Sequence, residues 1–337
     1  MTEFNNMIEK YMSRAVKENP LKIAQSKNLR YYSDFRKTIE LLDTCLTQKE
    51  MKELLERKLL LTTEYSQFTY LQSASEISVL AYIIEHYKNE FKYEPRYNGR
   101  KNPECSFKYK EQIINIEVKT PDLSNRWDAE SNSKLKIFLD ERIPKREEVV
   151  NSVVQSIESN IDSSVYSGVE ELKRLDNKLK DFLISANEKF IGTHEEDLNI
   201  LVVSLDIISD LDEWYSYIFG EDGVFTKKSY VESDKFKNVD AIMLSNAMCG
   251  HIRYEVEMND VWNLGNCGNY LFLNPSKENT SKGKFFHEHG LQMFGAFSLD
   301  FQEYLRSLDE EKSDYLEFRI SEAMIFTNYF KKRGITT

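Results

Sequence analysis

Hydrophobic side chains recur at helical spacing over much of the chain, and this spacing predicts where helices lie. Residues 1–66 contain stretches such as MKELLERKLLL and lack the alternation typical of strands, so we expect a helical N-terminal segment. Further helices are predicted over residues 73–91, 144–162, 165–190 and 301–334. The helix over residues 73–91 is expected to start within its Ser-rich stretch SASE, because Ser favours the position before a helix.

Strand patterns lie between these helical stretches. Residues 198–207, LNILVVSLDI, form a continuous apolar run rich in Val, Ile and Leu, which predicts a central strand buried on both faces. Two further strands are predicted over residues 239–246 and 269–274. Residues 120–143 show no regular pattern, so we expect a loop there.

Residues 104–119 predict a β-hairpin whose turn lies at residues 110–112, after a short extended segment over residues 92–97. The returning strand reads IINIEVKT, and its side chains point alternately to the two faces of the sheet. Glu117 and Lys119 therefore share the face opposite to the apolar one.

Glu104 starts the other strand of this hairpin. If the two strands are neighbours, Glu104 approaches Glu117 and Lys119 at one end of the sheet. Charged side chains on so apolar a strand are costly unless something specific uses them. The alternative is a solvated face of an edge strand, with Glu104 in a surface salt bridge that contributes little.

Composition restricts the class of protein. The chain has 337 residues, of which 41% are hydrophobic, with only 12 Gly and 6 Pro, so we expect a soluble globular protein rich in helix. The N-terminus has no basic region followed by an apolar run, and no apolar run is long enough to span a membrane. Four scattered cysteines fit a reducing compartment, and we expect a cytoplasmic protein without membrane association.

The formal net charge of −11 disfavours indiscriminate binding to nucleic acid. Residues 92–110 are the exception, with six basic residues against two acidic ones. The candidate nucleic-acid contacts there are Arg96, Arg100, Lys101 and Lys108. Tyrosines interleave with them and are candidates for stacking on bases. Alternatively, the stretch is an ordinary solvated loop.

The pattern formed by Glu104 after a proline, and by Glu117 and Lys119 separated by one residue, resembles the PD-(D/E)xK signature of restriction-endonuclease-like nucleases. The resemblance covers roughly residues 74–206 and takes in Glu76 on the preceding helix. It departs from the usual motif in having Glu at the first acidic position. It implies an α/β fold with a central mixed sheet flanked by helices.

This resemblance also implies the chemistry of the site. Glu104, Glu117 and the backbone carbonyl of Val118 are expected to bind Mg²⁺ or Mn²⁺, since hard oxygen ligands suit these ions. Lys119 is expected to orient water or to offset charge in the transition state, and Glu76 to hold the metal or a ligand. For Glu76, the alternative is an ordinary acidic residue favoured by the dipole at a helix N-terminus.

Two more side chains, Gln155 and Lys178, lie on predicted helices that in this family can face the active site. The implied activity is metal-dependent endonucleolytic cleavage of DNA, in bacterial antiviral defence, restriction or repair. The small basic footprint suggests that a sensor or activator subunit, or a homo-oligomer, is needed for engagement. The alternatives are a catalytically inactive scaffold and an RNA-cleaving nuclease.

A second group of residues suits zinc by its chemistry but not by its spacing. It consists of Cys249, His251, Cys267, His287 and His289. There is no CxxC or HxxxH pair, so buried cysteines and partly exposed histidines are the alternative. We divide the chain into a helical N-terminal module (residues 1–70), a nuclease-like core (residues 71–275) and a helical C-terminal region packed on the core (residues 276–337).

Overall fold

The computed structural model describes residues 2–62, 64–97, 101–122, 135–143, 145–160, 168–205, 211–256 and 260–294. The helix predicted over residues 301–334 therefore lies outside the described residues. Within them, no helix is both long enough and apolar enough to cross a membrane.

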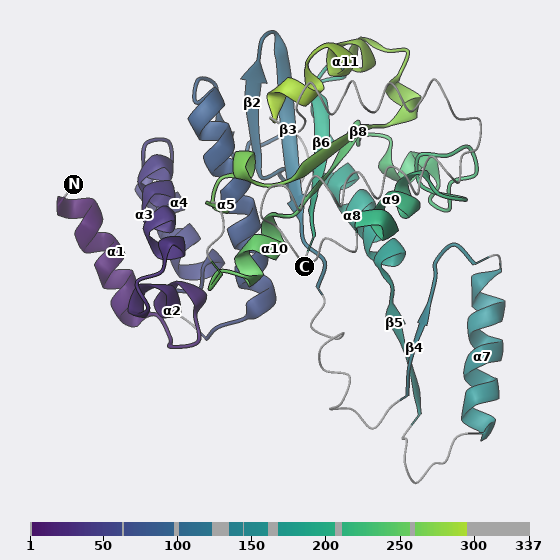
Figure 1. Ribbon diagram of the computed structural model, residues 1–337. Helices are drawn as coiled ribbons and strands as arrows, with labels where there is room; N and C mark the ends of the chain where they lie inside the picture. The colour runs from purple at the N-terminus through teal and green to yellow at the C-terminus, as the bar shows by residue number, and fades with distance from the viewer. Residues whose placement is uncertain are drawn as a thin grey trace.

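A six-stranded mixed sheet forms the centre of the molecule, in the order β1-β2-β3-β6-β7-β8 (Figure 1). Its strands are β1 (Lys92–Tyr93), β2 (Cys105–Tyr109), β3 (Gln112–Lys119), β6 (Leu198–Ser204), β7 (Ala241–Ser245) and β8 (Asn269–Leu273). β3, β6 and β7 run parallel, whereas the other neighbouring pairs are antiparallel. The predicted α/β class with a central mixed sheet is confirmed. The restriction-endonuclease-like form of that sheet stays a prediction.

Helices cover both faces of this sheet. α5 (Gln67–Tyr87) packs on one face, with α10 (Ala247–Ile252) beside it, and α8 (Leu175–Lys189) and α9 (Leu211–Phe219) cover the other. The predicted central strand, β6, is buried along its whole length. Its side chains alternate between the two cores, Val202 facing α5 and Val203 facing α8.

The N-terminal segment is helical, as its spacing predicts, and lies on the side of α5 away from the sheet (Figure 1). It consists of α1 (Thr2–Arg14), α2 (Pro20–Ser26), α3 (Arg30–Asp43), α4 (Gln48–Glu53) and the π-helical turn η1 (Leu54–Lys58). Its apolar side chains join α5 and one sheet face in a single hydrophobic core. The predicted boundary after residue 70 falls inside α5.

α5 begins earlier than the sequence predicts. Ser66 precedes it, and the Ser66 hydroxyl accepts a hydrogen bond from the N–H of Thr69 at 3.4 Å. The serines of SASE are buried inside the helix instead. Glu76 thus lies beyond the first two turns, and its interpretation as an acid at a helix N-terminus is wrong.

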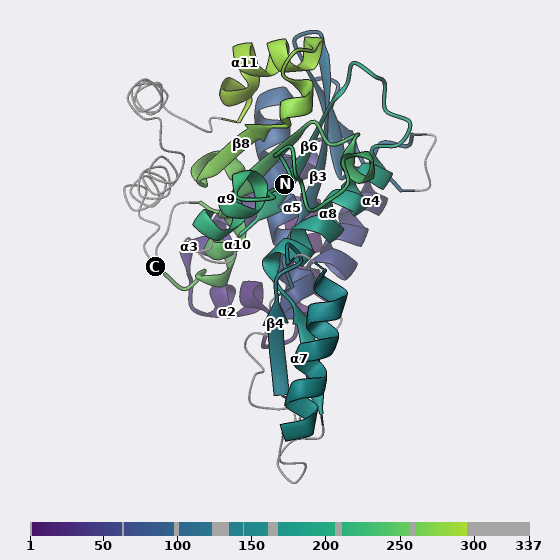
Figure 2. The ribbon, with the colours of Figure 1, turned by 90° about the vertical axis from the view of Figure 1, so that its right-hand side faces the viewer.

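An arm projects from the core between β3 and α8 (Figures 1 and 2). It consists of β4 (Leu135–Leu139), α7 (Arg146–Asn160) and β5 (Val169–Lys173), with β4 and β5 paired in parallel. α7 matches the predicted helix over residues 144–162. The loop predicted over residues 120–143 and the helix predicted over residues 165–190 are wrong at β4 and β5. Both strands are short and carry charged residues, so their sequences do not show the pattern expected of a buried strand.

One more α-helix and three short 3-10 turns complete the described fold. α11 (Ser281–Met293) follows β8 and packs against it. Short 3-10 turns, η3 (Ser233–Phe236), η4 (Leu264–Asn266) and η5 (Pro275–Lys277), link the later strands and helices. The strands predicted over residues 239–246 and 269–274 are confirmed as β7 and β8.

Candidate active site

The hairpin carries two of the predicted acidic residues. Ile116 and Val118 of β3 enter the core under α5, so Glu117 and Lys119 point to the α8 side of the sheet. The Glu117 side chain is 0% exposed, and the Lys119 Nζ lies 2.9 Å from its Oε1. The predicted faces of this strand are confirmed.

Glu104 immediately precedes β2. Its N–H donates to the carbonyl of Ile116 at 2.9 Å, which places it beside the end of β3 that carries Glu117. Its side chain is almost completely buried. Glu104 and Glu117 therefore come together as the hairpin predicts.

A lysine that sequence reasoning missed joins these two carboxylates. Lys189, the last residue of α8, lies with its Nζ 2.7 Å from Oε1 of Glu117 and 3.0 Å from Oε1 of Glu104. No local pattern distinguishes it from other lysines at the end of a helix. Only the packing of α8 on the sheet identifies it.

A second unpredicted lysine, Lys58, lies between Glu104 and Glu76 of α5. Lys58, at the end of η1, lies with its Nζ 3.3 Å from Oε2 of Glu104 and 3.0 Å from Oε2 of Glu76. The amide of Gln72 donates to the other oxygen of Glu76 at 3.0 Å. A weak signal for Lys58 exists, since it interrupts the apolar end of MKELLERKLLL.

The result is an alternating row of charges, which we call the carboxylate centre. Its members, in spatial order, are Glu76, Lys58, Glu104, Lys189, Glu117 and Lys119. They come from α5, η1, the start of β2, α8 and β3. Three carboxylates face three ammonium groups within the row, and the partly exposed Glu94 also contacts Lys58, with its Oε1 3.2 Å from Nζ.

Burial and the neighbouring charges shift the pKa values of these groups in different directions. Burial, reinforced by the charge of Glu104, raises the pKa of Glu76 to about 7. Burial and Glu104 also raise the pKa of Glu117. Burial would raise the pKa of Glu104 too, but the ammonium groups of Lys58 and Lys189 outweigh it and lower that pKa. Glu104 is thus the most firmly ionised of the three.

The same interactions act on the lysines. Burial alone lowers the pKa of an ammonium group, yet Glu76 and Glu104 raise the pKa of Lys58. Glu104 and Glu117 likewise raise the pKa of Lys189. Both lysines are therefore held as cations between the carboxylates.

The carboxylate oxygens of Glu104 and Glu117 suit a hard divalent ion bound between these two residues. Oε2 of Glu117 is buried and accepts no hydrogen bond from the described residues, although Oε1 is paired. Glu104 and Glu117 supply carboxylate oxygens, and the carbonyl of Val118 remains a predicted ligand. Within the described ranges, no three His, Cys, Asp or Glu side chains are grouped as a metal site by themselves. The lysines occupy the spaces between the carboxylates.

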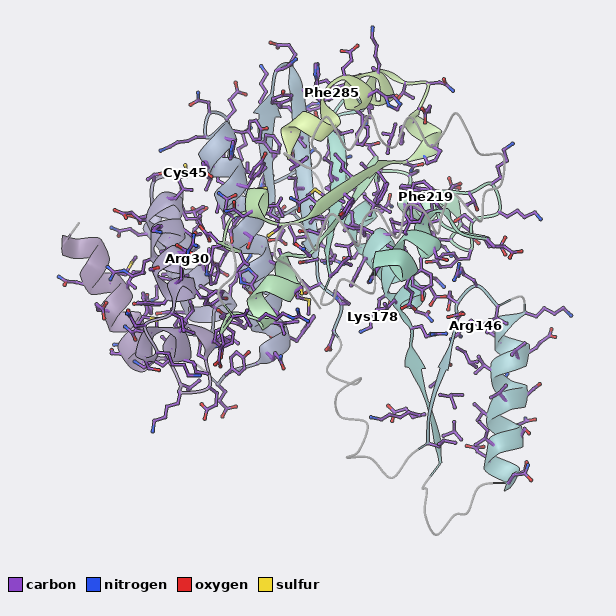
Figure 3. All side chains as sticks on the ribbon, in the orientation of Figure 1. Arg30, Cys45, Arg146, Lys178, Phe219 and Phe285 are labelled. Carbon is purple, nitrogen blue, oxygen red and sulfur yellow. The ribbon has the colours of Figure 1, made fainter. Side chains whose placement is uncertain are left out.

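The two candidate residues on later helices do not reach the carboxylate centre. Gln155 is exposed on α7 in the arm. Lys178 lies near the N-terminal end of α8, where that helix meets the arm, and its Nζ donates to the carbonyl of Asp122 (Figure 3). α8 does face the site, but through Lys189 at its opposite end.

The candidate nucleic-acid contacts differ in how far they are already paired. Arg96 is exposed. Lys101 Nζ lies 2.6 Å from Oε2 of Glu188, and Lys108 Nζ lies 3.4 Å from Oε2 of Glu111. Arg100 lies outside the described residues. The basic stretch therefore presents less free positive charge than its sequence suggests.

The candidate zinc residues have other partners. His251 is fully buried, and its ring nitrogens lie 2.9 Å from the hydroxyls of Tyr31 and Ser78. Burial lowers the pKa of His251 to about 3. Cys249 and Cys267 belong to the two separate hydrophobic cores. His287 contacts Glu278, and His289 contacts Lys110. Both cysteines are buried and His287 and His289 are partly exposed, as the alternative expects, whereas the fully buried His251 departs from it.

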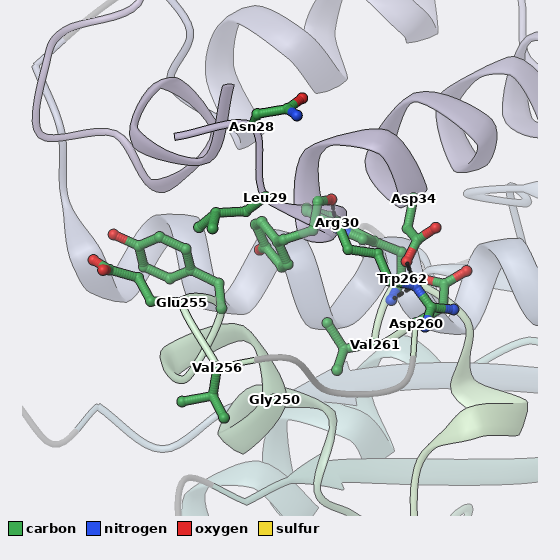
Figure 4. Close-up of a pocket in the computed structure, with 12 residues that line it drawn as sticks. Asn28, Leu29, Arg30, Asp34, Gly250, Glu255, Val256, Asp260, Val261 and Trp262 are labelled. Carbon is green, nitrogen blue, oxygen red and sulfur yellow. Dashed lines mark hydrogen bonds and ion pairs between the residues drawn. The ribbon is translucent and has the colours of Figure 1, made fainter. Parts of the chain in front are cut away.

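Two pockets lie away from the centre. One, of about 100 Å³, lies between the N-terminal helices and α10, with Arg30, Asp34 and Asp260 together at one end (Figure 4). Arg30 and Lys37 already pair with Asp34 at 3.0 and 2.8 Å. The other, of about 610 Å³, lies between the end of α8 and the start of α11 and has mixed charge. Neither pocket contains a member of the carboxylate centre.

No protein-family model, curated protein or solved structure matches this chain.

Proposed function

We propose that the protein is a metal-dependent nuclease that hydrolyses DNA phosphodiester bonds, with a restriction-endonuclease-like core. One observation carries the proposal. Glu104 and Glu117 are buried side by side, and Lys119 lies on the same face of β3 as Glu117. This is the arrangement that the PE…ExK pattern predicts. Neighbouring buried carboxylates whose pKa values are shifted, here upward for Glu117 and downward for Glu104, are typical of functional sites.

The metal expected here is Mg²⁺ or Mn²⁺. When bound by Glu104, Glu117 and the Val118 carbonyl, it would supply Lewis-acid stabilisation of the phosphate oxygens and acidify water. The buried Oε2 of Glu117, which has no partner among the described residues, is the oxygen best placed to gain from it.

The protein's own groups have separate roles in this proposal. Lys119 donates hydrogen bonds at the edge of the site, where it holds a water for in-line attack or offsets negative charge on the phosphate. Glu104 stays ionised because two ammonium groups flank it, and so it presents a constant negative charge. Lys189, which lies between both carboxylates, keeps them together before the metal arrives.

Substrate engagement is expected to need help from outside the site. The chain carries a net charge of −11, and two of its candidate phosphate contacts pair with glutamates. We therefore propose that an activator subunit or a second copy of the chain supplies further contacts. An isolated monomer that cut any duplex rapidly at physiological salt would contradict this part.

A specific observation favours a second candidate function. The three carboxylates of the centre are already neutralised by three lysines, so the fold needs no metal for charge balance. A non-catalytic scaffold would use the same residues as a buried ionic network. Such a scaffold binds no divalent ion at Glu104 and Glu117.

The test is cleavage of supercoiled plasmid, linear duplex DNA, single-stranded DNA and RNA with Mg²⁺ or Mn²⁺. Wild type is compared with Glu117→Ala and Lys119→Ala. The proposal expects metal-dependent cutting of DNA that both substitutions abolish, and preferential cutting of RNA would change the substrate class. Lys235→Ala, which removes an exposed lysine paired with Glu232 away from the hairpin, is the matched control.

If wild type cuts nothing, metal titration separates the remaining cases. Binding of Mn²⁺ that is lost in Glu117→Ala indicates an enzyme that lacks its activator. Absence of binding in wild type indicates the scaffold.

A further inference from the structure

Lys58 occupies the space between Glu76 and Glu104. Its Nζ lies 3.0 Å from Glu76, 3.3 Å from Glu104 and 3.2 Å from Glu94, and 5.4 Å from the centroid of the Tyr93 ring. Only 23% of its side chain is exposed. The ammonium group therefore has carboxylates on several sides and an aromatic ring beside it.

The backbone that carries Lys58 is anchored in the core. Leu54 and Leu55 before it, and Leu59 and Leu61 after it, are completely buried. The N–H of Leu59 donates to the carbonyl of Leu54 at 2.9 Å, which is the hydrogen bond of a π-helical turn. The lysine is thus held in place by its neighbours in sequence as well as by its ion pairs.

The space between Glu104 and Glu117 differs from that between Glu76 and Glu104. Lys189, which fills it, is the last residue of α8, where the chain leaves the helix. Beside it, Oε2 of Glu117 has no hydrogen-bond donor among the described residues, whereas both oxygens of Glu76 are bonded. An incoming cation therefore gains an unused ligand only on the Glu117 side.

We propose that Lys58 takes the place of a second divalent ion, so that the centre binds one metal ion, at Glu104 and Glu117, and not two. This inference rests on the proposed function. Glu104 is then shared between a metal ion on its Lys189 side and a fixed ammonium group on its Lys58 side.

Electrostatics gives the physical reason. A single divalent ion in place of Lys189, together with Lys58 and Lys119, already balances the charge of Glu76, Glu104, Glu117 and the neighbouring Glu94. A second divalent ion would have to share Glu76 and Glu104 with the ammonium group of Lys58. At such short range in a buried site, that repulsion strongly disfavours a second divalent ion.

The test counts Mn²⁺ ions bound to the full chain at about pH 8, above the pKa of Glu76. Electron paramagnetic resonance and calorimetry measure the stoichiometry and detect magnetic coupling between neighbouring ions. Wild type is expected to bind one Mn²⁺ without coupling. Lys58→Met removes the charge at similar length, and this variant is expected to bind two coupled ions.

Two further variants keep the result specific. Lys189→Met is expected to bind one ion about tenfold more tightly, because a competing cation is removed. Lys58→Met combined with Glu76→Gln is expected to return to one ion, because the second position loses a ligand. Thermal unfolding verifies that each variant is folded.

The outcomes separate this inference from the proposed function. Wild type that cuts DNA but binds two ions overturns the inference alone, as does a folded Lys58→Met variant that still binds one. Wild type that neither binds Mn²⁺ nor cuts overturns the proposed function, and the inference falls with it.

Discussion

Two buried ionic clusters in this protein combine carboxylates with lysines and differ in how many carboxylates they bring together. In the Asp240 cluster, a single fully buried carboxylate pairs with Lys282 at 2.8 Å and Lys277 at 3.4 Å. The N–H of Asn199 also donates to Asp240 at 2.9 Å. Oδ1 of Asp240 accepts no hydrogen bond from the described residues but faces the ammonium group of Lys277. In the carboxylate centre, three carboxylates share three lysines, and Oε2 of Glu117 has no hydrogen-bond donor among the described residues.

The difference separates a structural ion pair from a candidate catalytic one. One carboxylate between two lysines has excess positive charge and offers nothing to a metal ion. Three carboxylates in a row repel one another, and that repulsion contributes to the raised pKa values of Glu76 and Glu117. A divalent ion would relieve this repulsion, so the proposed function expects metal binding at the second cluster and not at the first.

The largest expected effect is on cleavage. Glu117→Gln is expected to lower DNA cleavage by at least about 10²-fold, because it removes an anionic metal ligand. The free energy of unfolding should fall less than in Asp240→Asn, because burial and Glu104 raise the pKa of Glu117 and because Lys189 keeps its ion pair with Glu104. Cleavage rates and urea unfolding measure the two effects. A large loss of stability without loss of cleavage would show that Glu117 has a structural role and no catalytic one.

The Asp240 cluster is expected to respond in the opposite way. Asp240→Asn leaves two mostly buried lysines without their carboxylate and is expected to lower the free energy of unfolding by about 3 kcal/mol. Cleavage by the folded variant should stay within about twofold of wild type, since Asp240 lies outside the carboxylate centre. A loss of cleavage in a variant that remains folded would place Asp240 in the site.

The pH dependence of stability sharpens the difference further. The pKa of Glu76 is raised from 4.5 to about 7, so the folded state keeps a proton that the unfolded state has lost in this window. Wild type should therefore lose stability relative to Glu76→Gln as pH rises from 4.5 to about 7, by up to about 3 kcal/mol. Thermal unfolding at several pH values measures this. Glu94→Gln removes a more exposed carboxylate that also touches Lys58, and is the control.

The smallest expected effect concerns nucleic-acid binding. Arg96→Ala is expected to weaken DNA binding modestly and to reduce the slope of log affinity against log salt by about 1. Lys101→Ala should change the slope less, because Lys101 already pairs with Glu188. Fluorescence anisotropy over a salt series measures both. Equal slopes for wild type and Arg96→Ala would remove Arg96 from the interface.

Sequence reasoning predicted the parts of this site that depend on local alternation. The period of two in IINIEVKT fixes the face of Glu117 and Lys119, and the hairpin brings Glu104 beside them. It missed Lys58 and Lys189, because each reaches Glu104 from a distant part of the chain through helix packing. The same limit applies to β4 and β5, whose pairing depends on the arm and not on a buried apolar pattern.

The π-helical turn at Leu54–Lys58 has a consequence at the level of the gene. Such a turn accommodates one residue more than an α-helical turn, so a single inserted codon is enough to create it. Deletion of one codon within it would restore the regular helix and rotate the following side chain by about 100°. If the deleted codon is that of Leu54 or Leu55, every charged residue is still encoded, but Lys58 would no longer point between Glu76 and Glu104.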